Sequence, residues 1–184
     1  MVRILDQTYA NCANHTSARI FYSASAIENL IIYCADVTNA FGEAPPPKQG
    51  CFLRPDRAFH DWWVNHKGRP PIPDGYVIPV LAAIQGHPES PRLWEKFIDK
   101  ILRHIGFVPT VHEPCLYSGT IDNERVLFLR QVDDFACAAP NSRIANIVYD
   151  KLDEYLFLPH YLPLQWPGHP TNQALHQAWL FYLH

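Results

Sequence analysis

Hydrophobic and polar positions along this chain predict an alternation of helices and short strands. Residues 17–30 carry apolar side chains at helical spacing, and Ser17 is a suitable N-cap for that helix. Residues 31–37, IIYCADV, form a short apolar run that predicts a buried strand. Residues 44–49, APPPKQ, are expected to form an extended connector, because proline cannot donate a hydrogen bond inside a sheet.

The pattern is weaker between residues 51 and 81. Residues 51–54 and 76–81 each predict a short strand. Residues 56–66 predict a helix, although three aromatic side chains weaken its helical signal. Residues 67–75, KGRPPIPDG, predict a loop.

Residues 90–106 predict the strongest helix of the chain. Ser90 would cap it, Pro91 would occupy its first position and Gly106 would end it. One side of this helix carries a basic stripe, formed by Arg92, Lys96, Lys100 and Arg103. The stripe could contact phosphates. Asp99 lies within it, however, at the spacing of a helical ion pair, which favours an ordinary exposed face.

The C-terminal half predicts a sheet and another helix. Residues 115–121 and 126–132 predict two strands joined by a turn around residues 122–123. Residues 135–139 predict a third strand, and residues 142–155 a helix with one apolar face. The order of helix, strand, helix, hairpin and helix predicts an α+β fold with an antiparallel sheet packed on helices.

Length and composition fit a globular protein with one main core. The chain has 184 residues, of which 48% are apolar, and a formal net charge of -3. This charge does not indicate nucleic-acid binding unless basic residues are concentrated locally. The five cysteines form no CxxC pair, which favours free thiols in a reducing compartment over a zinc site or disulfide framework. No apolar run is long enough for a signal peptide or a membrane span, so no membrane contact is expected.

The C-terminal end differs in composition from the rest of the chain. From Tyr155 to His184 there is no lysine, arginine, aspartate or glutamate, but there are four histidines and four prolines. The histidine spacing fits no metal-ligand pattern. We therefore divide the chain into a domain of residues 1–155 and a tail of residues 156–184, which is expected to be poorly ordered and to be a divergent or out-of-frame ending.

Three aspartates are candidates for a metal site. Asp133 and Asp134 lie between two apolar runs at an expected hairpin turn, and Asp36 is expected to end a central strand. Two Mg²⁺ ions about 4 Å apart, held by carboxylates, can stabilise both ends of a phosphoryl transfer. An aspartate pair also occurs in turns without any metal. The absence of glycine and the apolar flanks favour a cation, because paired carboxylates at buried strand ends repel each other.

Four short segments stand in a distinctive order and spacing. They are ADVTNAF at residues 35–41, ESPRLW at residues 89–94, GF at residues 106–107 and VDD at residues 132–134. Together they closely resemble the reverse transcriptase domain of copia-type retrotransposon polyproteins, over roughly residues 9–155. The resemblance implies a right-hand polymerase palm with part of the fingers and no thumb. It also implies RNA-directed DNA polymerase activity with two Mg²⁺ ions, for which Mn²⁺ could substitute.

The resemblance also implies roles for particular residues. The catalytic, metal-binding carboxylates are matched by Asp36, Asp133 and Asp134. Phe41 matches the bulky residue that excludes a 2′-hydroxyl, and Gln85 and Gly86 match residues that line the nucleotide pocket. The implied partners are an RNA or DNA template with a primer, deoxynucleoside triphosphates and the remainder of a polyprotein. The implied location is intracellular, in the cytoplasm or in virus-like particles.

Several features depart from that family. Gln131 stands where an aromatic residue usually precedes VDD, and IQGHPE at residues 84–89 replaces a stretch that usually contains YGLKQ. The basic upstream fingers segment is missing, and nothing after Tyr155 resembles a thumb, connection or RNase H. The chain is therefore expected to be a truncated fragment. Two alternatives to an active polymerase stay open: a catalytically inactive domain, kept for nucleic-acid binding or as a relic, and a small two-metal nuclease.

Overall fold

The computed structural model describes residues 10–156, which divide into two compact units. The sheet unit consists of residues 10–40 together with residues 95–156, and the second unit consists of residues 41–94. Apart from Leu156, the expected tail of residues 156–184 lies outside the described residues. The predicted boundary near residue 155 stays a prediction.

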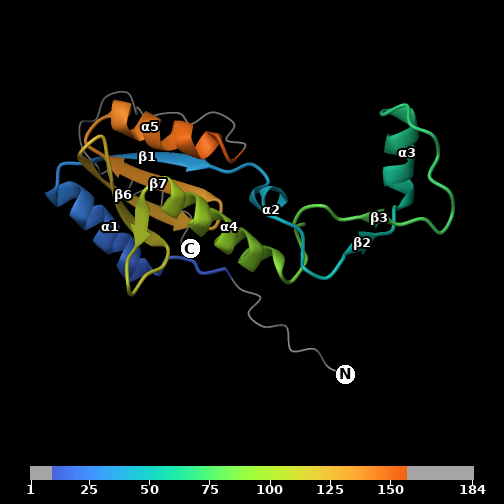
Figure 1. The fold of residues 1–184 in the computed structure, drawn as a ribbon, viewed down its shortest axis with the longest axis horizontal. Helices are drawn as coiled ribbons and strands as arrows, with labels where there is room; N and C mark the ends of the chain where they lie inside the picture. Colours follow the sequence, from blue (N-terminus) through green and yellow to red (C-terminus); the bar gives the residue numbers. More distant parts are fainter. Residues whose placement is uncertain (1–9, 157–184) are drawn as a thin grey trace, which may run out of the picture. The chain divides into compact units, whose positions relative to one another are not determined.

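The sheet unit is built on a five-stranded antiparallel sheet (Figure 1). Its strands, in their order across the sheet, are β1 (Ile31–Asp36), β7 (Asp134–Ala139), β6 (Glu124–Gln131), β5 (Leu116–Ile121) and β4 (Phe107–Pro109). This arrangement confirms the predicted α+β class with an antiparallel sheet. The prediction that Asp36 ends a central strand is wrong, because β1 lies at the edge of the sheet.

One face of the sheet packs against α1 (His15–Ile27), and β1, β6 and β7 contribute to the core there. The buried members of this core are Phe21, Leu30, Ile32, Leu127, Leu129, Ala136 and Ala138. β1 is therefore apolar because helices cover its faces, and not because strands flank it on both sides. This explains why an edge strand has the sequence pattern of a central one.

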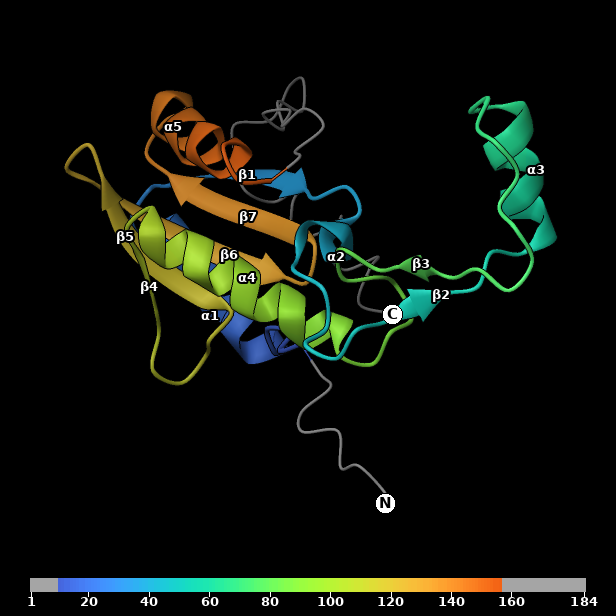
Figure 2. The same cartoon turned by 45° about the vertical axis from the view of Figure 1, so that its right-hand side comes forward.

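The other face of the sheet packs against α5 (Ser142–Asp153) and α4 (Ser90–His104) (Figure 2). The register aligns a row of side chains across this face, formed by Tyr33, Cys137, Phe128 and Tyr117. The buried hydroxyl of Tyr149 on α5 donates a 2.8 Å hydrogen bond to the carbonyl of Tyr33. The hydroxyl of Tyr117 donates a 3.1 Å hydrogen bond to Asp99 on α4. Both helices are thereby tied to the sheet by polar as well as apolar contacts.

The predicted hairpins are confirmed. Asp122 and Asn123 connect β5 to β6 with φ angles of 50° and 65°. Two positive φ values are the pattern of a type I′ turn, which aspartate and asparagine tolerate better than most residues. The strand β4, which the sequence pattern did not predict, pairs with β5 on its other side.

Two predicted helix caps are wrong. α1 begins at His15, because Asn14 caps it by accepting a 2.9 Å hydrogen bond from the N–H of Ser17. Ser90 does not cap α4, because its hydroxyl donates to the carbonyl of Ile84 at 2.6 Å. The predicted end of α4 is confirmed, since Gly106 follows it with a φ of 106°.

The second unit contains short elements and one exposed segment. Its elements are α2 (Ala40–Glu43), which begins one residue before the unit, β2 (Phe52–Leu53), α3 (Arg57–Asn65) and β3 (Ile78–Pro79). Asp56 caps α3 by accepting a 2.7 Å hydrogen bond from the N–H of Phe59. Residues 48–82, named the α3 segment below, include no buried residue. The predicted strands and helix of this region are confirmed, though each is shorter than expected.

The cysteines are free, as expected. Cys115 and Cys137 are buried, whereas Cys34 and Cys51 are half-buried. Burial raises the pKa of the Cys115 thiol to about 12, so this group stays protonated at neutral pH. Within residues 10–156, no helix has both the length and the apolar character that crossing a bilayer requires.

Candidate functional site

The sheet brings two of the three predicted aspartates directly opposite each other. Asp36 is the last residue of β1, Asp134 is the first residue of β7, and the antiparallel register pairs them. Directly opposed residues of an antiparallel pair point to the same face, with Cβ atoms about 4.5–5.5 Å apart. Both side chains are exposed. Two carboxylates that are far apart in sequence therefore meet at one end of the sheet.

Asp133 lies in the turn between β6 and β7. Its carbonyl accepts a 3.0 Å hydrogen bond from the N–H of Val37, which ties the turn to the end of β1. Val132, the first turn residue, has a φ of 56°, and Asp133 is not among the residues with positive φ. This is the sign pattern of a type II′ turn, whose first position normally holds glycine. A β-branched residue there is strained, so backbone strain occurs at the predicted site.

The negative charges of the three aspartates act on one another. The pKa of Asp134 is raised above its ordinary value, first by partial burial and then by the charges of Asp133 and Asp36. Like charges directly opposite each other on neighbouring strands also destabilise the pairing. A cation among the three carboxylates would offset this repulsion.

The chemistry of these three side chains fits magnesium, because Mg²⁺ prefers carboxylate oxygens. The backbone also fits, since Asp36 and Asp134 face each other beside the turn that holds Asp133. The carboxylates do not converge on one point, however. Within the described part of the chain, no three histidine, cysteine, aspartate or glutamate side chains are grouped so that they could hold a metal ion.

A buried arginine lies on β6 just before this turn. The Arg130 side chain is fully buried, and its Nη2 lies 3.7 Å from Oε1 of Glu95 on α4. The same nitrogen donates a 3.5 Å hydrogen bond to the sulfur of Cys115, whereas Nε and Nη1 have no partner among the described residues. Glu95 also accepts a 2.6 Å hydrogen bond from Nδ2 of Asn11. Arg130 thereby links β6 to α4 and to the segment before α1.

Gln131 has a structural role. Its Oε1 accepts a 3.1 Å hydrogen bond from the N–H of Ala13, and Cys12 forms an isolated antiparallel bridge with it. Glu113 holds the same segment by accepting hydrogen bonds from N and Nδ2 of Asn14 at 3.3 and 3.1 Å. These contacts fix the segment before α1 beside the turn that carries the aspartates.

The predicted nucleotide-pocket residues belong to the second unit. Phe41 is half-buried, whereas Gln85 and Gly86 are exposed. Gln85 and Gly86 form the middle of a turn closed by a 3.2 Å hydrogen bond from the N–H of His87 to the carbonyl of Ile84. The φ of Gly86 is 88°, which favours glycine at the third position of a type II turn. The turn therefore accounts for this glycine, and the roles of all three residues toward a nucleotide stay predictions.

The basic stripe of α4 forms the ion pair that its spacing predicts. Nε of Arg103 lies 2.8 Å from Oδ2 of Asp99, and both belong to the sheet unit. Lys96, Lys100 and Arg103 are exposed. The predicted ion pair is therefore confirmed, and contact of the stripe with phosphates stays a prediction.

Comparison with known proteins found no match: no family model, no curated protein and no solved structure matches the chain. The resemblance to copia-type reverse transcriptases therefore rests on the four quoted segments. The structure adds three observations: the facing carboxylates, the strained turn and the buried arginine on β6 just before that turn. Polymerase identity and activity follow as proposals from these two sources.

Proposed function

We propose that this chain is the palm, with part of the fingers, of an RNA-directed DNA polymerase of a retrotransposon polyprotein. The observation that carries this proposal is the pairing of Asp36 with Asp134 at one end of an antiparallel sheet, with Asp133 in the adjoining turn. The helices on both faces of the sheet support it further, because rigid strand ends hold catalytic side chains with little freedom.

In the proposed reaction, the 3′ oxygen of a primer forms a bond to the α-phosphorus of a deoxynucleoside triphosphate, and the bond to pyrophosphate breaks. Asp36, Asp133 and Asp134 would hold two Mg²⁺ ions through their carboxylate oxygens. The ions, when bound, supply charge stabilisation for the attacking and leaving oxygens. The hydrogen bond from Val37 to the carbonyl of Asp133 keeps the three carboxylates at one end of the sheet.

The resemblance also implies three residues that would contact the incoming nucleotide. Phe41 would select deoxyribose by its bulk, and Gln85 and Gly86 would line the nucleotide pocket. The implied partners are a primed RNA or DNA template and the remainder of the polyprotein. The implied location is intracellular, in the cytoplasm or in virus-like particles.

The test is incorporation of deoxynucleotides on an RNA template with a DNA primer, in Mg²⁺ and separately in Mn²⁺. We expect the Asp133→Asn variant to lose roughly 100-fold or more of the rate, because one metal ligand is worth several kcal/mol in the transition state. Asp122→Asn is the matched control, since Asp122 occupies the turn of the neighbouring hairpin and pairs with the exposed Arg143 at 2.8 Å. Equal rates for the wild type and Asp133→Asn would refute the assignment.

The second candidate is a catalytically inactive domain of the same origin, kept for nucleic-acid binding or as a relic. Gln131 favours it, because this side chain is engaged with the backbone of Ala13 at a position where the family usually has an aromatic residue. Template binding without incorporation would indicate a binding module, and loss of both would indicate a relic. Metal-dependent cleavage of nucleic acid without added nucleotides would indicate a nuclease instead.

A further inference from the structure

The α3 segment, residues 48–82, exposes an aromatic stripe. Phe59, Trp62 and Trp63 occur at the spacing that places side chains on one side of a helix. Their rings form a group: the centroid of Phe59 lies 5.5 Å from that of Trp62 and 5.9 Å from that of Trp63. A helix normally buries such a stripe against a core. Here α3 has no buried residue, and 43% of the Trp62 surface is exposed.

The chain after α3 folds back on the end of this helix and fixes the stripe. The indole N–H of Trp63 donates a 3.0 Å hydrogen bond to the carbonyl of Pro70. The N–H of Arg69 donates to the carbonyl of Trp63, and the N–H of Lys67 donates to the carbonyl of Trp62, both at 3.2 Å. The Trp63 ring and the backbone beside Trp62 are therefore held in place before any partner binds, which lowers the entropic cost of binding.

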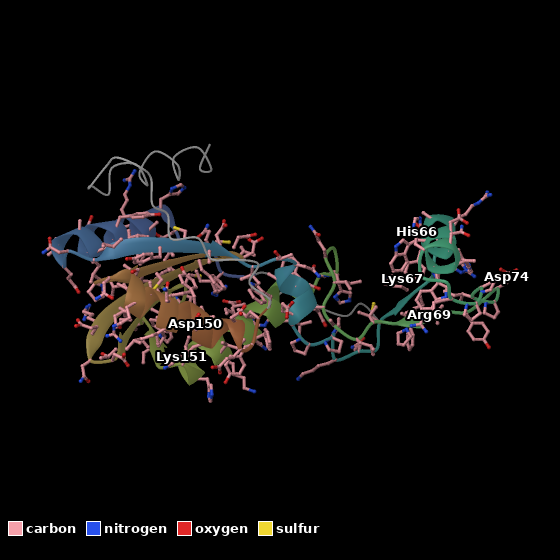
Figure 3. The ribbon with its side chains drawn as sticks, turned by 90° about the horizontal axis from the view of Figure 1, so that it is seen from above. His66, Lys67, Arg69, Asp74, Asp150 and Lys151 are labelled. Carbon is pink, nitrogen blue, oxygen red and sulfur yellow. The ribbon has the colours of Figure 1, made fainter. Side chains whose placement is uncertain are left out.

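Positive charge accompanies the exposed rings. Between the flanking Asp61 and Asp74, residues 62–73 contain Lys67, Arg69 and His66 but no aspartate or glutamate, in a chain whose net charge is -3. Figure 3 shows these three side chains around the C-terminal end of α3, with Asp74 farther along the following loop. The Lys67 ammonium lies 5.1 Å from the centroid of the Trp62 ring. Cationic and aromatic groups thus share one small surface.

We propose that this surface, formed by Phe59, Trp62, Trp63, His66, Lys67 and Arg69, binds single-stranded nucleic acid. Its rings stack with unpaired bases, and Lys67 and Arg69 contact the phosphates between them. Aromatic side chains among basic ones suit this ligand, because every unpaired base presents a flat face and every nucleotide a negative charge. A duplex keeps its base faces stacked inside and offers the rings nothing comparable. The proposal goes beyond the polymerase assignment, since none of these residues belongs to the carboxylate site.

The experiment measures fluorescence anisotropy of labelled single-stranded oligonucleotides with the full-length chain, in EDTA and without nucleotides. We expect the wild type to bind and Trp62→Leu to bind roughly 5- to 150-fold more weakly, because each base–aromatic stack contributes about 1–3 kcal/mol. Trp62→Phe keeps a ring and is expected to retain most of the affinity. Lys67→Ala is expected to lower the slope of log affinity against log salt by about 0.7, the value for one phosphate contact on a single strand.

Two control variants make the experiment specific. Tyr76→Leu changes an aromatic residue of the same unit that is 63% exposed but lies outside the stripe, and Arg125→Ala removes an exposed cation of the sheet unit. Both are expected to bind like the wild type. No binding by the wild type, equal binding of Trp62→Leu, or equal affinity for a duplex of the same length would each overturn the proposal. None of these outcomes tests metal binding by Asp36, Asp133 and Asp134, because metal and nucleotides are left out.

Discussion

Aromatic residues have opposite environments in the sheet unit and in the α3 segment. Phe128 and Phe135 are fully buried between the strands and the covering helices, with ring centroids 5.3 Å apart. The rings of Phe59 and Trp62 are almost as close, at 5.5 Å, yet neither side chain is buried. The two pairs of rings are therefore about equally close, but only the Phe128–Phe135 pair is shielded from water. Because burial is the main stabilising term, we infer that the first pair supports the fold, whereas the second leaves surface for a partner.

Cationic residues show the same contrast. Arg130 is fully buried in the sheet unit with a distant carboxylate partner, whereas Lys67 and Arg69 are exposed in the α3 segment. A buried guanidinium is held by its surroundings and loses hydration, while an exposed one keeps its hydration and remains available to an anion. Arg130 thus joins β6 to α4 inside the sheet unit, whereas Lys67 and Arg69 belong to the surface proposed for binding.

The largest expected effect comes from truncating one aromatic residue in each region. We expect Phe128→Ala to lower the free energy of unfolding by about 3–5 kcal/mol, because it leaves a cavity in a packed core. Trp62→Ala, its counterpart in the α3 segment, is expected to change it by less than about 1 kcal/mol. Chemical denaturation followed by far-UV circular dichroism measures both values. A loss of similar size for Trp62→Ala would mean that its ring is buried in solution.

The next effect separates two arginines of the same strand, β6. Arg130→Ala is expected to lower the free energy of unfolding by about 3 kcal/mol, because it leaves a cavity and removes the partner of the largely buried Glu95. Arg130→Met fills similar volume without a charge, so it should cost much less and could stabilise the fold. Arg125→Ala is expected to lower the free energy of unfolding by less than about 1 kcal/mol, because Arg125 is exposed and pairs with Glu28 at 2.8 Å.

Urea denaturation of these three variants provides the measurement. Similar losses for Arg130→Ala and Arg125→Ala would contradict the view that burial, and not charge alone, decides the contribution of an arginine here. A large loss for Arg130→Met as well would mean that the charge itself, with its weak partners, stabilises the strand.

The sequence predicted well those elements that depend on neighbouring residues. The hairpin strands and their turns follow from apolar runs separated by residues that tolerate positive φ, such as Asp122 and Asn123. β4 was missed because it is only three residues long and exists through its pairing with β5. The position of β1 was misjudged because helices on both faces make an edge strand as apolar as a central one.

The candidate site was only partly predictable. The expected strand end at Asp36 and the expected hairpin turn at Asp133 and Asp134 suggested that these aspartates meet, and the register pairs Asp36 with Asp134. The positive φ of Val132 could not be read from the sequence, because valine by itself favours extended backbone. The contacts of Arg130 and Gln131 join residues that are distant in sequence, so no local sequence pattern predicts them. A charged or polar residue within a strand also gives no sign of whether it is buried.

The smallest expected effect comes from repulsion among the three carboxylates of the sheet unit. These exposed anions contrast with the exposed cations of the α3 segment. Because the pKa of folded Asp134 lies above its ordinary value of 3.8, the folded state binds a proton there more tightly than the unfolded state. The stabilisation from this proton is therefore complete below about pH 4 and is lost as the pH rises through the folded pKa. Asp134→Asn cannot titrate, so it should gain stability relative to the wild type as the pH rises, by roughly 0.2–1 kcal/mol at pH 7.

Urea denaturation at several pH values between 3 and 7 measures this difference, with Asp122→Asn as the control from the neighbouring hairpin. Asp122 pairs with Arg143 instead of facing other carboxylates, so its variant should show no such gain at neutral pH. Added Mg²⁺ should stabilise the wild type more than Asp134→Asn if the ion binds the folded carboxylates. A difference that is constant with pH, or that favours the wild type at pH 7, would mean that the three aspartates do not repel one another as their placement implies.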